Sequence, residues 1–260
     1  MKQKIYALVN MTLYGVMLTM NALANILPIN GKNTGELSDQ YPNLFVPAGI
    51  TFSIWGFIYI LLLFFVVYQV YAAFSKREVT LLNSFAGSLF GLTCILNSLW
   101  ILAWHYEYIL LSVVVMLGFI TALILLYRIT DKTRPDSLFA RFCVKVPISV
   151  YLGWISIATI ANLTALLVSF NWSGFGIPES IWAVVMIGAG ALLATLMLIK
   201  RGDIAYSLVV IWAFTGIIIK RSGQTIIYNE IIYAGYIAIL IIVVAIVNYN
   251  IHSGLGAPKR

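Results

Sequence analysis

Aromatic rings, indole N–H groups and carboxamides recur at helical spacing in one long apolar stretch, residues 146–170. Tyr151, Trp154, Ala158 and Asn162 follow one another in steps of three, four and four residues, which keeps them on one face of a helix. Such a face can stack on a flat apolar molecule and hold it with a few hydrogen bonds. Because an unpaired amide in hydrocarbon costs several kcal/mol, we expect this face to turn toward other helices or a ligand.

Two earlier apolar stretches carry similar faces. Trp55 and Tyr59 are four residues apart in one of them, and Asn97 and Trp100 are three apart in the other. We therefore expect side chains from three helices to converge beneath the polar segment 30–43, which is rich in turn residues. The residues expected to converge are Trp55, Tyr59, Asn97, Trp100, Trp154 and Asn162.

Composition indicates what must position these faces. Of the 260 residues, 62% are hydrophobic and 10% are charged, whereas soluble domains carry about 25% charged residues. Long apolar runs are typical of membrane-spanning helices. The sequence predicts an all-α polytopic membrane protein with eight transmembrane helices. Their approximate ranges are 5–28, 46–74, 80–104, 107–129, 144–170, 178–199, 203–220 and 228–251.

The sixteen Lys and Arg residues are distributed unevenly between the two ends of these spans. With both termini on one side, that side holds thirteen of them, and the other side holds only Lys32, Lys220 and Arg221. Cytoplasmic loops carry the excess of positive charge in membrane proteins. We expect both termini to be cytoplasmic, in the cytoplasmic (plasma) membrane. Because the net charge of +7 then belongs to these loops, it predicts no nucleic-acid partner.

Residues for catalysis or metal binding are scarce. His105 and His252 both lie at predicted helix ends, and Cys94 and Cys143 fall in or near apolar runs. No nucleophile set, phosphate-binding loop or metal motif is legible. We therefore predict no catalytic residues, no metal ligands and no enzyme activity.

A few charged groups near the membrane each allow two interpretations. His105 and Glu107 have the spacing of a metal pair, but a solvated loop is favoured. Glu230 could be a proton site, but a charge at a helix N-terminus is favoured. Lys220 and Arg221 could bind an anionic group, but a pair reaching outward from the membrane is favoured.

Other polar and aromatic side chains are explained by packing in a membrane. Three asparagines of the first span are expected to join helices by hydrogen bonds: Asn10, Asn21 and Asn25. Three tryptophans near predicted helix ends are expected to be interface anchors: Trp104, Trp172 and Trp182. Gly87 and Gly91 are expected to allow close helix packing.

The three faces resemble those of the tryptophan-rich sensory protein family, which includes TspO and the mitochondrial translocator protein (peripheral benzodiazepine receptor). The family's second-helix motif is matched by Pro47, Trp55 and Tyr59, although Gly49 and Ser53 depart from it. The third-helix motif is matched by Leu96, Asn97 and Trp100. The fifth-helix motif is matched by Tyr151, Leu152, Trp154, Ala158 and Asn162, with Val150 in place of a proline.

The resemblance covers residues 1–170 and implies a TspO-like five-helix bundle, followed by a three-helix transmembrane extension over residues 171–260. It implies a pocket for a tetrapyrrole such as haem or another porphyrin, or for a sterol-like lipid, in a sensor, regulator or transporter. The ligand-binding residues it predicts are Pro47, Trp55, Tyr59, Asn97, Trp100, Tyr151, Trp154, Ala158 and Asn162. No cofactor is required, and the expected partners are membrane lipid, the hydrophobic ligand and a second copy of the chain.

The residues themselves agree with a flat ligand, because a Trp-lined apolar cavity with a few amides suits one. No histidine lies deep in a span, which favours stacking on a macrocycle over axial ligation of haem iron. Two other function classes stay open. One is a small secondary transporter with eight spans and no tetrapyrrole role, and the other is a membrane enzyme that modifies a porphyrin or lipid.

Overall fold

Eight long helices account for most of the chain. A computed structural model describes residues 2–27, 29–75, 84–133 and 137–255. Eight helices in these ranges are long and apolar enough to cross a membrane, which confirms the predicted fold class. They are α1 Lys2–Ile26, α3 Ile54–Phe74, α4 Ser84–His105, α5 Ile109–Lys132, α6 Leu138–Ser169, α7 Glu179–Arg201, α8 Ile204–Ser222 and α9 Asn229–Leu255.

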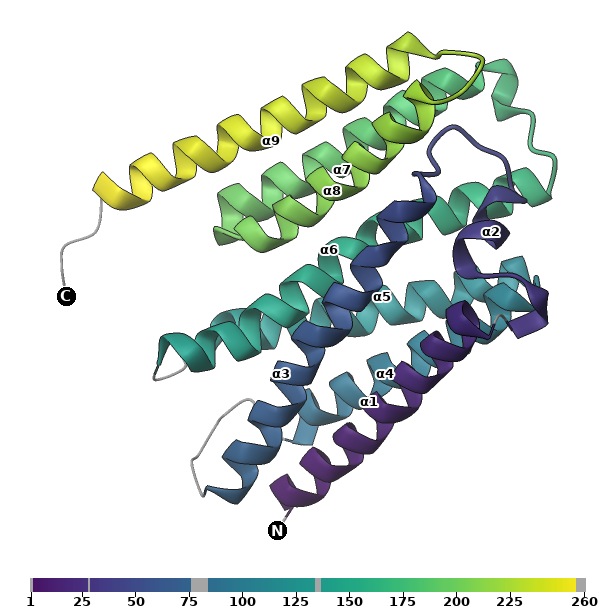
Figure 1. Cartoon of the computed structure of the whole chain (residues 1–260). Coiled ribbons are helices and arrows are strands. Elements are labelled where there is room, and N and C mark those ends of the chain that lie inside the picture. The colour runs from purple at the N-terminus through teal and green to yellow at the C-terminus, as the bar shows by residue number, and fades with distance from the viewer. Residues whose placement is uncertain (1, 28, 76–83, 134–136, 256–260) are drawn as a thin grey trace.

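The first five of these helices close into a ring. Helix α3 packs against α1 and α6, α4 packs against α1 and α5, and α5 packs against α6. Helices α7, α8 and α9 pack on one another beside this ring, and α8 lies against α6 (Figure 1). The first residues of α1 and the last of α9 lie at the same end of the molecule. Five of the cations predicted to be cytoplasmic lie outside the described residues: Lys76, Arg77, Arg134, Lys259 and Arg260.

Small residues set the closest helix approaches, as predicted for α4. A Cβ atom added at Gly91 would lie 3.0 Å from the side chains of Asn10 and Leu13 on α1. The same arrangement joins α6 to α8, where a Cβ at Gly153 would lie 3.2 Å from the backbone oxygen of Tyr206. Between membrane helices, such close contact supplies the attraction that the hydrophobic effect supplies in water.

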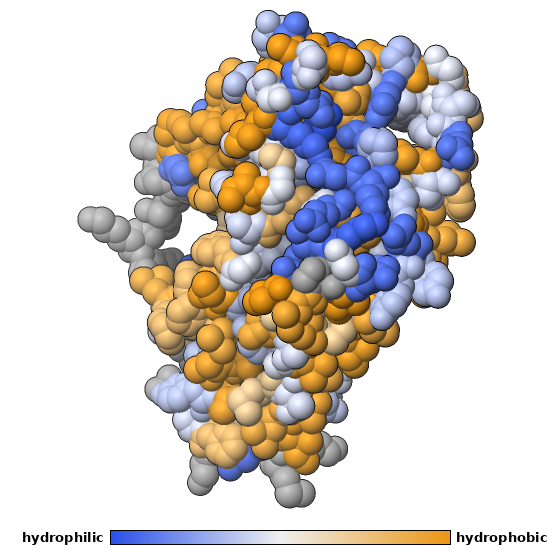
Figure 2. Space-filling view, turned by 45° about the vertical axis from the view of Figure 1, so that its right-hand side comes forward, coloured by the Kyte–Doolittle hydropathy of each residue, from blue (hydrophilic) through white to orange (hydrophobic). Residues whose placement is uncertain are grey.

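The segment between α1 and α3, residues 29–53, folds over one end of the ring and is called the cap below. It contains a 3-10 turn, Ile29–Gly31 (η1), the short helix α2, Thr34–Asp39, and a second 3-10 turn, Gly49–Ser53 (η2). Asn33 and Glu36 form a capping box that starts α2. Pro47 precedes η2, so it does not occupy the first turn of α3. When this end of the molecule is turned forward, hydrophilic residues gather on one part of the surface, beside a mainly hydrophobic surface (Figure 2).

His105 anchors this segment. The prediction of a solvated loop at His105 was wrong, because the side chain is fully buried. Its Nδ1 lies 3.1 Å from the Ile29 carbonyl oxygen and its Nε2 lies 3.2 Å from the Thr34 hydroxyl. The ring therefore ties α4 to both η1 and α2. Among the described residues no cluster of His, Cys, Asp and Glu could hold a metal ion.

Candidate functional site

An apolar cavity lies between α3, α4 and α6, beneath α2 and η2. Its volume is about 40 Å³. It is lined by Thr34, Ser38, Pro47, Phe52, Trp55, Trp100, Trp104, Trp154, Ile157, Ala158, Ala161 and Asn162. Six of the nine predicted ligand-binding residues are in this set, and they come from three helices and the segment before α3. The segment 30–43 contributes Thr34 and Ser38, as expected of a cap.

Tryptophan rings form most of the cavity wall. The ring centroid of Trp55 lies 6.1 Å from those of both Trp100 and Trp154, and the Trp154 ring is nearly perpendicular to it at 84°. Trp104 stacks on Trp100 at 6.0 Å with an interplanar angle of 16°. A π-rich wall of this kind can stack on a flat aromatic guest or meet it edge to face.

Trp104 was predicted to be an interface anchor, and that prediction was wrong. The residue is 5% exposed and lines the cavity one turn beyond Trp100. Its position near a helix end suggested an anchor, but α2 and η1 fold over that end and bury it. In the sequence, two features indicated that Trp104 lines the cavity: its i to i+4 spacing from Trp100 and the polar segment before α3.

Asn162 fixes the orientation of one wall. The Trp100 indole N–H donates to Asn162 Oδ1 at 3.0 Å, and Asn162 Nδ2 donates to Ser112 Oγ at 2.9 Å. All three residues are buried and come from α4, α6 and α5. Because the amide is satisfied on both sides, it holds three helices in register and keeps the Trp100 ring from turning.

The other three predicted site residues do not line the cavity. Tyr59 and Tyr151 pack against Trp55, with ring centroids 5.7 and 6.2 Å away. Asn97 donates to the Tyr151 hydroxyl at 2.9 Å and accepts from Asn21 at 2.6 Å. These residues support the Trp55 ring from behind.

The asparagines of α1 act mainly as predicted. Asn21 pairs with Asn97 on α4, and Asn10 Nδ2 donates to Gln69 Oε1 on α3 at 3.2 Å. Asn25 bonds only within its own helix, to the Asn21 carbonyl oxygen at 2.9 Å. The first two therefore join helices, and the third is local.

Two indole N–H groups of the cavity residues have no partner among the described residues. They belong to Trp104 and Trp154, which are 5% and 2% exposed. A buried donor left without an acceptor costs about 1–3 kcal/mol, so native structures rarely retain one without a reason. Both residues line the same cavity.

The cavity is too small in this structure for a drug-sized ligand. Pockets that hold drug-sized ligands have volumes of roughly 300–1,000 Å³, far above the 40 Å³ found here. Phe52 of η2 lies with its ring centroid 6.0 Å from that of Trp154, edge to face, and forms part of the wall. A ligand of that size would therefore fit only if residues of the wall, such as Phe52, move.

The cap is also held by contacts with the end of α4. Tyr41 lies 5.9 Å from the Trp104 ring centroid, and its hydroxyl donates to the Glu107 carboxylate at 3.3 Å. Burial raises the pKa of Tyr41, and the neighbouring Glu107 carboxylate raises it further. The hydroxyl therefore stays protonated and able to donate. Lys32 pairs with Glu107 at 3.7 Å on the exposed side.

Helix α8 holds η2 from the other side. The Ala48 backbone N–H donates to the Gly216 carbonyl oxygen at 3.0 Å, and the Trp212 indole N–H donates to the Thr51 carbonyl oxygen at 2.9 Å. A Cβ atom at Gly216 would overlap the Thr51 side chain. The 3-10 turn η2, whose Phe52 lines the cavity, therefore packs directly on a helix outside the five-helix ring.

The comparisons with known proteins agree with this architecture. A family model described as TSPO-like protein matches residues 7–248. The chain belongs to the TSPO-like protein family. The match continues past residue 170 through α7 and α8 and into α9, so the TSPO-like model also covers helices that the sequence motifs alone did not reach. A comparison with curated proteins and one with solved structures gave no match.

Proposed function

We propose that this TSPO-like membrane protein binds a flat hydrophobic ligand in the Trp-lined cavity and acts as a sensor, regulator or transporter of it. The ligand class is a tetrapyrrole, such as a porphyrin or haem, or a sterol-like lipid. The observation that carries the proposal is the pair of buried, unpartnered indole N–H groups of Trp104 and Trp154 at one aromatic cavity. A guest with carbonyl, carboxylate or ring-nitrogen acceptors would complete both hydrogen bonds.

The residues of the wall favour a stacked macrocycle over a ligated metal. No histidine, cysteine or methionine is among the described residues that line the cavity. His105 follows Trp104 in the sequence, but both of its ring nitrogens lie at hydrogen-bond distance from Ile29 and Thr34. The protein we infer is a binding protein rather than an enzyme, and needs no resident cofactor.

The proposed orientation places the cap on the non-cytoplasmic side of the cytoplasmic membrane. The start of α1 and the end of α9 lie at one end of the molecule, and α2 lies at the opposite end (Figure 1). The distribution of Lys and Arg assigns the end with the termini to the cytoplasm. Reporter fusions after Thr133 and at the C-terminus should report the cytoplasm, and fusions at Asn30 and Gly174 the opposite side. A C-terminal fusion that reports the external side would exclude this arrangement.

The proposal is tested by titrating purified protein with protoporphyrin and following the quenching of tryptophan fluorescence. Trp100→Ala and Trp154→Ala should each weaken binding about tenfold, because each removes a stacking partner and about 1.4 kcal/mol corresponds to one decade. Trp154→Phe keeps a ring but loses the N–H group, and should lose only a few-fold. Trp182→Ala lies outside the cavity and is the control. If both alanine variants stay folded and bind like the wild type, the rings only pack the bundle.

A further inference from the structure

A buried arginine at the end of α8 has no carboxylate partner. Arg221 is 3% exposed. Its Nη1 donates to Gln224 Oε1 at 2.8 Å and its Nη2 donates to the Val46 carbonyl oxygen at 3.2 Å, while its Nε has no partner. No ion pair joins Arg221 to any described residue. The prediction that both cations reach outward was therefore wrong for Arg221, whereas Lys220 pairs with the exposed Asp39.

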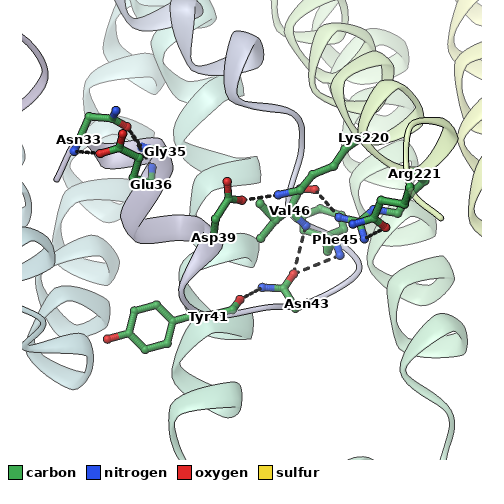
Figure 3. Close-up of polar contacts among 11 residues, drawn as sticks. Asn33, Gly35, Glu36, Asp39, Tyr41, Asn43, Phe45, Val46, Lys220 and Arg221 are labelled. Atoms are coloured by element: carbon green, nitrogen blue, oxygen red, sulfur yellow. Dashed lines mark hydrogen bonds and ion pairs between the residues drawn. The ribbon is translucent and has the colours of Figure 1, made fainter. Parts of the chain in front are cut away.

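The carboxylates near Arg221 are engaged elsewhere. Asp39 of α2 pairs with Lys220, the neighbouring residue on α8. Glu179, at the start of α7, accepts a hydrogen bond from the Leu44 backbone N–H at 3.0 Å. Figure 3 shows Lys220 and Arg221 reaching from α8 toward the segment from Asp39 to Val46. Among the described residues, the guanidinium therefore has no carboxylate within ion-pair distance, although Glu179 and Asp39 lie near enough to favour its charge, and its Nε is a free donor in a buried position.

A second cavity opens beside this guanidinium. Its volume is about 710 Å³, and its polar wall includes Asn43, Glu179, Lys220, Arg221, Gln224 and Tyr228. The volume falls within the range of roughly 300–1,000 Å³ that drug-sized ligands occupy. It is much larger than the Trp-lined cavity and, unlike it, is lined by charged residues: the cations Lys220 and Arg221 and the carboxylates Asp39 and Glu179.

The two cavities lie on either side of one stretch of chain. Ser38 lines both of them, and the adjacent residues Val46 and Pro47 line the polar and the Trp-lined cavity, respectively. A molecule with an apolar ring system and an acidic substituent would find a surface for each part on the two sides of the segment from Ser38 to Pro47. A sterol-like lipid without an acid would use only one of them.

A buried cation stays costly until an anion or several hydrogen bonds compensate for its lost hydration. Arginine is suited to carboxylates, because its planar group presents two parallel donors to two oxygens. Here Nε is free, and it lies on the residue that lines the cavity. A carboxylate bound in this cavity would offer the free Nε an acceptor.

We propose that the polar cavity is an anion site in which Arg221, assisted by Lys220, binds the carboxylate of the same ligand whose ring occupies the Trp-lined cavity. This inference rests on the proposed function and narrows its ligand class to acidic amphipathic molecules. Helix α8 would then recognise the acid, and the Trp-lined cavity would recognise the apolar rings of the ligand.

The test compares two ligands that differ only in the acid. Purified full-length protein is titrated with protoporphyrin, a dicarboxylic acid, and with its dimethyl ester, which has the same ring and no charge. The wild type should bind the diacid about tenfold more tightly than the diester, and Arg221→Gln should reduce diacid affinity about tenfold, to the level of the diester. Diester affinity should not change in Arg221→Gln. Arg221→Lys, which keeps the charge, should fall between the two.

Arg201→Gln is the matched control, because it removes one arginine charge at α7's far end, where Arg201 pairs with Asp131 at 3.0 Å. It should leave both affinities unchanged. Equal binding of diacid and diester by the wild type would overturn the anion site while leaving the Trp-lined cavity intact. An equal loss of both ligands in Arg221→Gln would also overturn it, since Arg221 would then only hold the cap through Val46. Failure of the wild type to bind either porphyrin would overturn the tetrapyrrole proposal, and this inference with it.

Discussion

The five-helix ring and the three-helix unit of α7, α8 and α9 use polar side chains differently. In the ring, buried amides join one helix to another inside the bundle, as in the pairs Asn21 with Asn97 and Trp100 with Asn162. In the three-helix unit, several polar side chains instead reach out of the unit. Trp212 and Arg221, both on α8, donate to backbone oxygens of the segment before α3.

The difference indicates that the two regions of this TSPO-like protein have different structural roles. Buried interhelical hydrogen bonds fix where the rings of the Trp-lined cavity stand. Contacts from α8 fix the position of η2, and with it Phe52, which forms part of the cavity wall. A further contact at the opposite end, from the Ser149 hydroxyl of α6 to Asp203 at the start of α8 at 2.5 Å, ties the two regions together along their length. The three-helix unit therefore serves the cavity without lining it.

The largest effect should come from filling the close contact between α8 and η2. A Cβ at Gly216 would overlap Thr51, so Gly216→Ala must displace η2 and with it Phe52. Overpacking of this kind costs about 1–3 kcal/mol. We expect a lower midpoint of thermal unfolding in detergent and at least about tenfold weaker porphyrin binding.

Gly188→Ala on α7 is the control for Gly216→Ala. A Cβ there would meet nothing within 4 Å, and both positions are helical, so each alanine gains about the same 1 kcal/mol of helix propensity. Gly188→Ala should therefore stabilise the protein. A Gly216→Ala protein with wild-type stability and affinity would show that η2 is not seated on α8 as described.

The second prediction tests the hydrogen bonds that join helices inside the five-helix ring. Asn162→Leu keeps a similar volume but leaves the Trp100 N–H and the Ser112 hydroxyl without their common partner. The expected loss in the free energy of unfolding is about 1–3 kcal/mol. Asn25→Leu removes only a bond within α1 and should cost well under half as much. Equal losses in the two variants would mean that the interhelical hydrogen bonds of Asn162 contribute no more to stability than a hydrogen bond within one helix.

Much of this arrangement could be predicted from the sequence. Apolar run lengths placed the eight spans within a few residues, with two exceptions: α6 begins six residues before its predicted start, and α3 begins eight residues after it, because η2 occupies the first part of that span. Residue spacing identified the faces that bear Trp55, Trp100 and Trp154. Spacing within one helix tells which residues share a face, but not which neighbour they meet. The contact of Gly216 with Thr51 joins residues far apart in sequence, so no local pattern could predict it. Arg221 resembled a solvent-exposed charge for the same reason.

The division of the chain near residue 171 stays a prediction. It was placed where the distinctive polar and aromatic faces end, and the turn-rich stretch Asn171–Pro178 does separate α6 from α7. The contacts of α8 with Ala48 and Thr51 indicate that residues 1–170 need the following helices to hold the cap in place. Structural and functional boundaries therefore need not coincide here.

The third effect separates a general hydrogen bond from one that holds the cap. Trp212→Phe and Trp182→Phe each remove one indole N–H bond to a backbone carbonyl, that of Thr51 in the first case and Gly174 in the second. Each should lower the free energy of unfolding by about 0.5–1.5 kcal/mol. Porphyrin affinity should fall a few-fold only in Trp212→Phe, because only Thr51 belongs to η2. A similar loss of affinity in both variants would point to general loosening.

The smallest effect should have the opposite sign for binding. The Asp39 side chain is 59% exposed, so its ion pair with Lys220 contributes at most about 1 kcal/mol to stability. Asp39→Asn keeps the shape of α2 but releases the Lys220 ammonium from its ion pair and leaves Glu179 as the one described carboxylate that lines the polar cavity. Binding of the porphyrin diacid should strengthen about two- to threefold at low ionic strength, and salt should reduce the gain. Binding of the diester should not change. Weaker binding of the diacid in this variant would mean that Asp39 holds the cap in its binding conformation, and that the ion pair matters more than the free cation.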